Sequence, residues 1–306
     1  MGYLACKAAA RDGSEGTLAN GYWTVNVVSA ELCGKRITPL YGSLYSQESP
    51  AFISENHELL TAVAMVARAV GRRGIWVMDR GGDRPSLFNP LLDDGLRFLL
   101  RLRGDRQLVC GGKARSALSA AENCPMPYAE TTLRERDGKP RAVRVEFGAR
   151  RVRLPWRDDD LWLVVVKGFG KEPLMLLTNT DITKSRKSLW RVIRQYITRW
   201  EIEETIRYVK QSYGLENVRV RKYEALRNLF AIVQAAVYFA TAWLGQYARS
   251  GILAHHAITA AKRFFGAPEF VYYAISDGVG EILRKHGSYA KEPNVRQRTL
   301  PQLALL

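Results

Sequence analysis

The sequence predicts an α/β protein whose core is interrupted by a β-rich insertion ahead of its last helices. A short apolar run at residues 75–78 ends in Asp79 and a glycine turn, a pattern typical of buried strands in α/β sheets. Between residues 97 and 183, short apolar runs alternate with turns rich in Gly, Pro and Asp. After residue 184 the apolar residues follow a helical period.

The first segment, residues 1–96, is predicted to hold the first part of the core. Two strands are expected at residues 22–29 and 35–44, joined by a turn at Cys33 and Gly34. A packed helix should follow, with Ser54 as its N-cap and glycines at its end. The strand that ends at Asp79 comes next.

The second segment, residues 97–183, is expected to be a β-rich insertion or subdomain. Its strands are predicted at residues 97–102, 142–147, 161–166 and 174–177. The third segment, residues 184–250, should be helical, with helices at residues 189–213 and 224–247. Residues 251–306 form a tail region of mixed pattern.

The charge of the chain indicates a polyanionic partner. It has 46 Lys and Arg against 30 Asp and Glu, a net charge of +16, and a pI of about 9.9. Lys and Arg that neutralise phosphates release counterions, which drives binding to nucleic acid of any sequence. The alternative is a surface that is basic without a bound partner.

The sequence favours neither a zinc site nor a membrane protein. Its four cysteines are widely spaced, without a C-x-x-C pair. The N-terminus lacks the apolar core of a signal peptide. The apolar residues 229–244 are interrupted by Gln234 and short for a membrane span, so a buried helix is expected there. We expect a cytoplasmic, nucleoid-associated protein with no membrane partner.

One predicted helix carries a polar stripe that could perform chemistry. Tyr196, Arg199, Glu203 and Lys210 fall within an arc of roughly 60° on a helix. A neighbouring apolar stripe is predicted to pack on a sheet; it consists of Ile202, Ile206, Val209 and Tyr213. An acid beside two cations and a phenol suits a site for metal and phosphate. The alternative is a solvated helix face with an ordinary Arg199–Glu203 ion pair.

The spacing Tyr196-x2-Arg199-x3-Glu203-x6-Lys210 resembles the Y-x2-R-x3-E-x6-K motif of DDE-type transposases of the insertion-sequence-four family. The run from Asp79 to Asp83 after an apolar strand is similar to that family's second acidic motif. The order of the elements resembles an RNase H-like core with an insertion before its last catalytic helix. The resemblance covers about residues 1–247.

The resemblance implies a DNA transposase that cuts and joins strands at transposon ends. Asp79 and Glu203 would be the second and third ligands of two Mg²⁺ or Mn²⁺ ions. Tyr196, Arg199 and Lys210 would contact phosphates of double-stranded DNA. Further basic residues and one aromatic residue would lie along the same track: Lys184, Arg186, Lys187 and Trp190. A homodimer bridging two transposon ends is implied, and Arg80 and Asp83 would shape the turn.

The first acid of the family has no clear counterpart in this sequence. In the family it lies on the first core strand, between the second strand and the strand that ends at Asp79. In this sequence a loop-like stretch begins at about residue 10. We therefore expect the chain to be N-terminally truncated and the core to be incomplete, with its first strand missing. Asp12 is the one substitute ligand considered. The loss should leave two unpaired inner strand edges.

Three functions remain open at this point. The first is a transposase that is inactive in this truncated form, so that the chain binds DNA without cutting it. The second is a non-catalytic remnant or regulator that grips transposon ends. The third is a structure-selective nuclease on the same fold. Trp156, Trp162 and Trp190 are the tryptophans that could stack on a base, although each could equally belong to the core.

Overall fold

A computed structural model describes most of the chain. The described residues are 8–11, 18–32, 37–136, 139–214, 218, 220, 222–244, 248, 250–253 and 271–286. The predicted turn at Cys33 and Gly34, the substitute ligand Asp12 and most of the tail region lie outside them.

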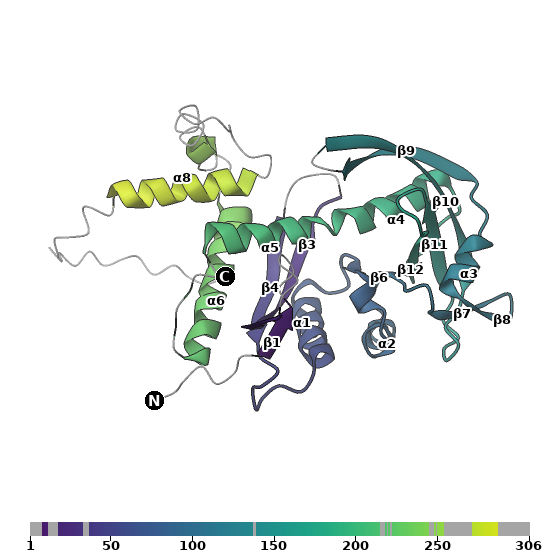
Figure 1. Ribbon diagram of the computed structural model, residues 1–306, viewed down its shortest axis with the longest axis horizontal. Helices are drawn as coiled ribbons and strands as arrows, with labels where there is room; N and C mark the ends of the chain where they lie inside the picture. Colours follow the sequence, from purple (N-terminus) through teal and green to yellow (C-terminus); the bar gives the residue numbers. More distant parts are fainter. Residues whose placement is uncertain are drawn as a thin grey trace.

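A six-stranded mixed sheet is the largest element of the fold (Figure 1). Its strand order is β5-β6-β12-β11-β10-β9. β5 and β6 pair in parallel, and the other neighbours pair antiparallel. The strands are β5 (Trp76–Met78), β6 (Phe98–Arg101), β9 (Tyr128–Arg136), β10 (Lys139–Val152), β11 (Leu161–Lys167) and β12 (Leu174–Thr178). The sheet therefore crosses the boundary predicted at residue 97, since β5 and β6 lie on either side of it; the four-segment division stays a prediction.

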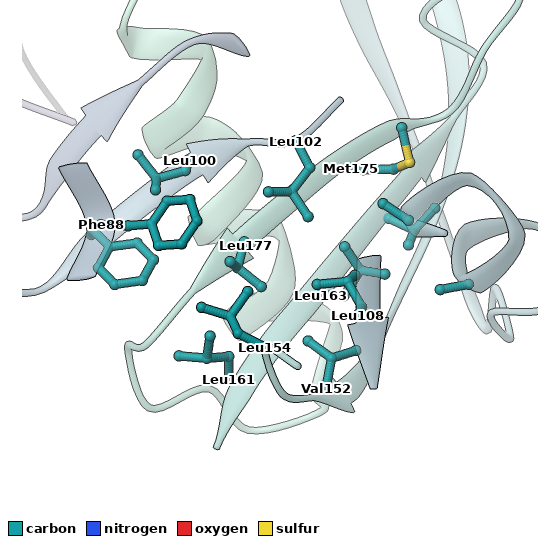
Figure 2. Close-up of a cluster of buried hydrophobic side chains, with 14 of the residues drawn as sticks. Phe88, Leu100, Leu102, Leu108, Val152, Leu154, Leu161, Leu163, Met175 and Leu177 are labelled. Atoms are coloured by element: carbon teal, nitrogen blue, oxygen red, sulfur yellow. The ribbon is translucent and has the colours of Figure 1, made fainter. Parts of the chain in front are cut away.

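The centre of the sheet is buried on both faces, which explains why β11 is apolar at nearly every position. Leu161, Leu163 and Val165 point into one hydrophobic cluster, and the residues between them point into another. The first cluster includes side chains of β6, β12 and the short helices α2 (Pro85–Asp93) and α3 (Ala117–Glu122) (Figure 2). The second is covered by α4 (Arg186–Thr198).

A separate hairpin lies beside the large sheet. It consists of β3 (Trp23–Ala30) and β4 (Ile37–Tyr45), with a shift of register between Val27 and Val28. Helix α1 (Glu55–Val70) packs against it, and Ser54 caps this helix by accepting a hydrogen bond from the backbone N–H of His57 at 3.1 Å. The expected strand pair, helix and cap are confirmed. Two short strands precede them, β1 (Ala8–Arg11) and β2 (Leu18–Gly21).

Helix α1 joins the hairpin to the large sheet. Its Ala62 belongs to the cluster beneath β3 and β4, whereas the adjacent Val63 belongs to the first cluster of the large sheet. The helix therefore holds the two sheets beside each other.

The segment after residue 184 is helical where it is described, as predicted, but the expected helix over residues 189–213 is divided. α4 ends at Thr198 and α5 (Glu201–Ser212) begins after a turn at Arg199 and Trp200. Figure 1 shows the two as a long rod that runs from the large sheet toward the β3–β4 hairpin. Beyond it lie α6 (Tyr223–Tyr238), the π-helical turn η3 (Phe239–Trp243) and α8 (Val271–His286).

The apolar stripe predicted for this helix is wrong in part. Ile206 is 36% exposed, and the buried face of α5 consists of Thr205, Tyr208 and Val209. That face packs mainly among α6, η3 and α8, with Ile37 of β4 at its edge, so helices rather than a sheet cover it.

The expectation of a buried helix at residues 229–244 is also wrong in part. By length and composition the stretch Tyr223–Trp243 could cross a membrane, and 28% of its apolar window is buried. One face packs on β4 and α8, while Ile232, Phe239 and Trp243 are exposed. The absence of a membrane partner stays an expectation.

The sequence patterns did not indicate several other elements. These are α2, α3, β9 and the hairpin of β7 (Gln107–Cys110) and β8 (Lys113–Ser116). The predicted strand at residues 142–147 is the middle of the much longer β10.

Candidate catalytic and DNA-binding site

Asp79 lies directly after β5, where the strand ends in a tight turn. Its side-chain Oδ1 accepts a hydrogen bond from the backbone N–H of Gly81 at 2.8 Å, so the carboxylate caps the turn Arg80–Gly82. Asp79 is exposed. A Cβ at Gly82 would come within 2.6 Å of the Cβ of Met78, so the turn can close this tightly only with glycine there. The turn presents the Asp79 carboxylate to solvent.

Asp83 anchors the turn from inside. Its side chain is fully buried and accepts hydrogen bonds from Arg106 Nε at 2.6 Å and from the backbone N–H of Arg103 at 2.8 Å. Arg106 also donates to the Asp83 carbonyl at 2.8 Å. The expectation that Asp83 shapes the turn is confirmed. Arg80 makes an exposed ion pair with Glu172 at 3.5 Å.

Glu203 lies in the first turn of α5 and is paired with Arg199. Nη2 of Arg199 donates to Oε1 of Glu203 at 2.9 Å, and the side chains are 15% and 58% exposed respectively. The Arg199 guanidinium carbon also lies 5.7 Å from the centroid of the Tyr196 ring. Nε of Arg199 is buried and has no hydrogen-bond partner among the described residues. The carboxylate is thus held by a cation that retains one unused donor.

The expected ridge of four exposed side chains is wrong at its first position. Tyr196 is 4% exposed and packs with Leu189, Val192 and Ile193 against the large sheet. When α4 and α5 are placed on one helical wheel, their buried faces lie on roughly opposite sides. The predicted ridge is therefore buried in α4 and exposed in α5. Glu203 and Lys210 are exposed, as expected. A DNA contact by Tyr196 stays a prediction, which the burial of its ring disfavours.

Each of the two acids directly follows a residue that lines one cavity. A cavity of about 570 Å³ lies between β3, α1, β5 and the α4–α5 rod. Its lining includes Met78, which precedes Asp79, and Ile202, which precedes Glu203. The described strands leave β3 paired only with β4, and β5 paired only with β6. Within the described part of the chain, one edge of each of these two strands therefore has no paired strand, and the loss of a core strand stays a prediction.

The residues present fit a divalent cation only in part. Exposed carboxylates are suitable ligands for Mg²⁺ or Mn²⁺. Within the described ranges, however, no group of three or more His, Cys, Asp or Glu side chains is placed to hold a metal ion. Asp79 and Glu203 would therefore need a further ligand to hold two ions.

The basic residues predicted to follow the DNA lie near the start of α4, in varied environments. Lys187 is exposed, whereas Arg186 is ion-paired with Glu130. Lys184 Nζ lies 5.7 Å from the centroid of the Trp162 ring, and the Arg151 guanidinium lies 4.0 Å from it. These two cations form a positive cluster over one buried ring.

The three tryptophans considered for base stacking are all engaged with protein. Trp162 is 6% exposed beneath its two cations. Trp190 is half-buried, with its ring 5.5 Å from that of Phe147. Trp156 stacks on Phe88 at 6.2 Å and donates to Asn89.

A family model describes most of this arrangement. The model for the transposase DDE domain matches residues 39–239, which include both acids, the insertion and the α4–α5 rod. The chain belongs to the DDE transposase family. Its mixed α/β architecture is consistent with the RNase H-like fold expected from the resemblance.

Among solved structures, the chain is similar to a piggyBac transposase in a synaptic complex with hairpin DNA. The identity is 11% and the TM-score is 0.45. The match covers 99% of this chain and 56% of that one, so this transposase-family chain spans little more than half the length of its structural neighbour. No curated protein matches the chain.

Two side chains near the site were not selected from the sequence. Trp200 is 53% exposed in the turn between α4 and α5, one helical turn before Glu203. The signal available in the sequence was a tryptophan three residues before the motif glutamate. Arg151 was hidden among many arginines of the insertion, and only the cross-strand pairing of Arg151 with Trp162 identifies it.

Proposed function

We propose that the chain is a DDE transposase of the cut-and-paste lineage that binds double-stranded DNA at transposon ends. The observation that carries the proposal is that Asp79 and Glu203 each follow a residue that lines one cavity, Met78 and Ile202, within the part of the chain that matches the transposase domain. The net charge of +16 supports a DNA partner, because a basic surface gains affinity by releasing counterions.

Asp79 and Glu203 are proposed to hold Mg²⁺ or Mn²⁺. When bound, two such ions would activate water or a 3′-hydroxyl and stabilise the leaving oxygen at phosphorus. The cap on Gly81 fixes the orientation of the Asp79 carboxylate, and Arg199 fixes that of Glu203. Lys187 and Lys210, both exposed, would position the phosphate backbone without reading its sequence. A homodimer on two DNA ends and a cytoplasmic, nucleoid-associated location belong to the same proposal.

The 306-residue chain alone is proposed to bind DNA without cleaving it, as a non-catalytic remnant or regulator would. The supporting observation is that no third metal ligand joins Asp79 and Glu203 in the described ranges. Two-metal chemistry depends on ions that are held firmly at both oxygens of the displacement.

The deciding experiment measures binding and cleavage on the same DNA. Purified protein is incubated with end-labelled transposon-end DNA and Mg²⁺ or Mn²⁺, and bound and nicked fractions are separated by electrophoresis. We expect a bound fraction and no nicking. If the protein nicks the DNA and Glu203→Gln abolishes the nicking, the proposal that this chain does not cleave DNA is wrong. If the protein does not bind the DNA, the whole proposal is wrong.

A designed variant distinguishes an incomplete site from a wrong assignment. A strand that ends in Asp is fused ahead of the chain, and the control fusion ends in Asn. Cleavage by the Asp fusion alone would support an incomplete set of carboxylates. If both fusions bind DNA and neither cleaves it, the proposal that Asp79 and Glu203 are two of three metal-binding carboxylates is wrong.

A further inference from the structure

We propose that the outer face of α6 and η3 binds the same face of a second copy of this chain, with the two helices antiparallel. α6 packs on β4, on the side of the hairpin away from the large sheet (Figure 1). The contact forms without DNA, so its test is separate from those of the proposed function.

Exposed apolar side chains form a stripe along this face. Ile232 is 65% exposed, Phe239 is 49% exposed and Trp243 is 71% exposed. Seven residues separate Ile232 from Phe239, and the exposed Ala235 lies between them, which is the spacing of a helix that packs against another helix.

The stripe is also free of charge. No Asp, Glu, Lys or Arg occurs from residue 228 to residue 243, although the chain carries a net charge of +16. Two copies of so basic a chain repel each other across most of their surfaces. A contact between copies is therefore favoured where the surface is uncharged and apolar, as it is here.

A hollow lies at the other end of the same helix. Its volume is about 380 Å³, and residues 41–44 of β4 form one side of it. The other side belongs to the first half of α6 and includes Arg227, Asn228 and Ala231. The protruding rings thus stand at the C-terminal end of the face, and the hollow lies at its N-terminal end.

An antiparallel pair that crosses at Ala235 brings the rings and the hollow together. Residues 227 and 243 are each eight positions from Ala235, so a twofold axis there places Trp243 level with the partner's Arg227. A guanidinium beside an indole ring is a favourable pair. Phe239 falls level with the partner's Ala231 by the same count. Each large ring then meets a small or hollowed part of the partner, and the two alanines at the axis allow close approach of the helices.

The exposed rings offer a substantial part of the area that a dimer needs. A buried aromatic side chain contributes about 150–250 Å², so the exposed fractions of Tyr238, Phe239 and Trp243 amount to roughly 250–400 Å². One partner in a standard interface contributes about 800 Å². Ile232, the exposed alanines and the lining of the hollow add to the rings, and we expect a dimer with a dissociation constant in the micromolar range.

A lipid bilayer is the other surface that an apolar helix of this length could meet. The hollow beside the stripe argues for protein, because its lining includes Glu224, Arg227 and Asn228. Charged and amide side chains are costly to bury against acyl chains, whereas a protein partner can supply polar or aromatic groups to them.

Sedimentation equilibrium of the full chain without DNA, over a range of protein concentrations, tests the proposal. We expect a monomer–dimer equilibrium that Phe239→Glu weakens at least tenfold. Met65→Glu adds the same charge at another exposed apolar position, on α1, where Met65 is 56% exposed, and should leave the equilibrium unchanged. A monomer at all concentrations, or equal weakening by the two variants, would overturn the proposal.

Cysteine cross-linking tests the antiparallel arrangement with substitutions that add no charge. Ala235→Cys places two thiols at the axis, and copper phenanthroline should oxidise them to a disulfide between copies. Ala225→Cys is the matched control on the same exposed face, because the two copies of residue 225 would lie about 30 Å apart. The yield is compared with that of the unaltered protein, which has four cysteines of its own. Equal yields from the two variants would overturn the arrangement.

Cosedimentation with vesicles of phosphatidylcholine and phosphatidylglycerol distinguishes a second copy from lipid. We expect Phe239→Glu to leave vesicle binding unchanged while it weakens the dimer. If Phe239→Glu instead abolishes vesicle binding and leaves self-association unchanged, the face meets lipid and the proposal is wrong.

Discussion

Arg199 donates a hydrogen bond to Glu203 across one turn of helix, at 2.9 Å, from a guanidinium that is itself largely buried. The pair crosses the junction between α4, whose buried face meets a sheet, and α5, whose buried face meets helices. Arg199 is therefore fixed by packing while Glu203 remains accessible. A metal ion that approached Glu203 would have to compete with a cation that is already in place.

We expect metal binding to need both acids and to be weak. Asp79 and Glu203 should lie with carboxyl groups within roughly 4–8 Å, close enough to share a metal cluster. Asp79→Asn and Glu203→Gln should each abolish binding of Mn²⁺, measured by the loss of the free-ion signal in electron paramagnetic resonance. Glu204→Gln is the matched control, because Glu204 is paired with Arg207. If both acid variants still bind Mn²⁺, the assignment of Asp79 and Glu203 as metal ligands is wrong.

Removing the competing cation should have the opposite effect on metal. Arg199→Ala leaves Glu203 without its partner, so Mn²⁺ affinity should rise several-fold in the same titration. An unchanged affinity would show that Glu203 is not a ligand or that the ion pair opens without cost.

DNA binding should depend on the exposed Lys187 and Lys210 of the α4–α5 rod and on the partly exposed Arg199. Arg199→Ala combined with Lys210→Ala should weaken binding to all sequences, and Lys187→Ala should do the same. The slope of log affinity against log salt should flatten by about one unit per lost phosphate contact. Lys113→Ala, on β8 rather than on the rod, is the control. Slopes that match the unaltered protein would mean that this surface does not touch DNA.

Asp83 should be among the most sensitive positions for folding. Asp83→Ala leaves Arg106, itself only 17% exposed, without its partner and frees the N–H of Arg103, so we expect a loss of about 3–5 kcal/mol. Glu172→Ala removes the exposed partner of Arg80 and should cost about 0–1 kcal/mol. Urea unfolding measures both. Equal losses would show that the buried network does not hold the Asp79 turn.

Tyr45 should make the protein less stable in alkali. Burial, with the nearby carboxylates of Glu55 and Glu58, raises the pKa of Tyr45 to about 12 from an ordinary value of 10.0. The folded state then binds more protons than the unfolded state between these values, so stability falls as the pH rises through this window. Tyr45→Phe should lessen the fall between pH 10 and 12 in urea unfolding. Parallel curves for the two proteins would contradict the shift.

The parts of the fold that the sequence predicted are those with strong hydrophobic patterns. β11 is a run of apolar residues because both of its faces are covered, and Ser54 signals its helix by capping it. β9 was missed because its residues, such as Thr131, Thr132 and Arg134, are polar and it is held mainly by pairing with β10. The dipeptide Asp137-Gly138 between them in the sequence is a hairpin signal that could have revealed the pair.

The positions of the two candidate acids could be predicted from the sequence, whereas the burial of the side chains around them could not. Asp79 follows from the strand that it terminates, and Glu203 from the spacing of the motif; their metal-binding roles stay predictions. The burial of Tyr196 was not predictable, because residues 199–200 contain neither Gly nor Pro to mark the division between α4 and α5. Helical spacing alone assumes one buried face, whereas the tertiary contacts impose two.

The order of strands in the large sheet determines when each strand can pair during synthesis of the chain. β6 can pair with β5 as soon as residue 100 is made, but its other edge pairs with β12, where Leu99 faces Thr178. About eighty residues must leave the ribosome before that edge is satisfied, which at 5–20 residues per second takes several seconds or more. During that interval the strand that carries Asp79 belongs to a two-stranded fragment with open apolar faces. Slow codons or a chaperone acting between residues 100 and 178 would therefore affect the yield of native protein more than the same intervention within α6 or α8.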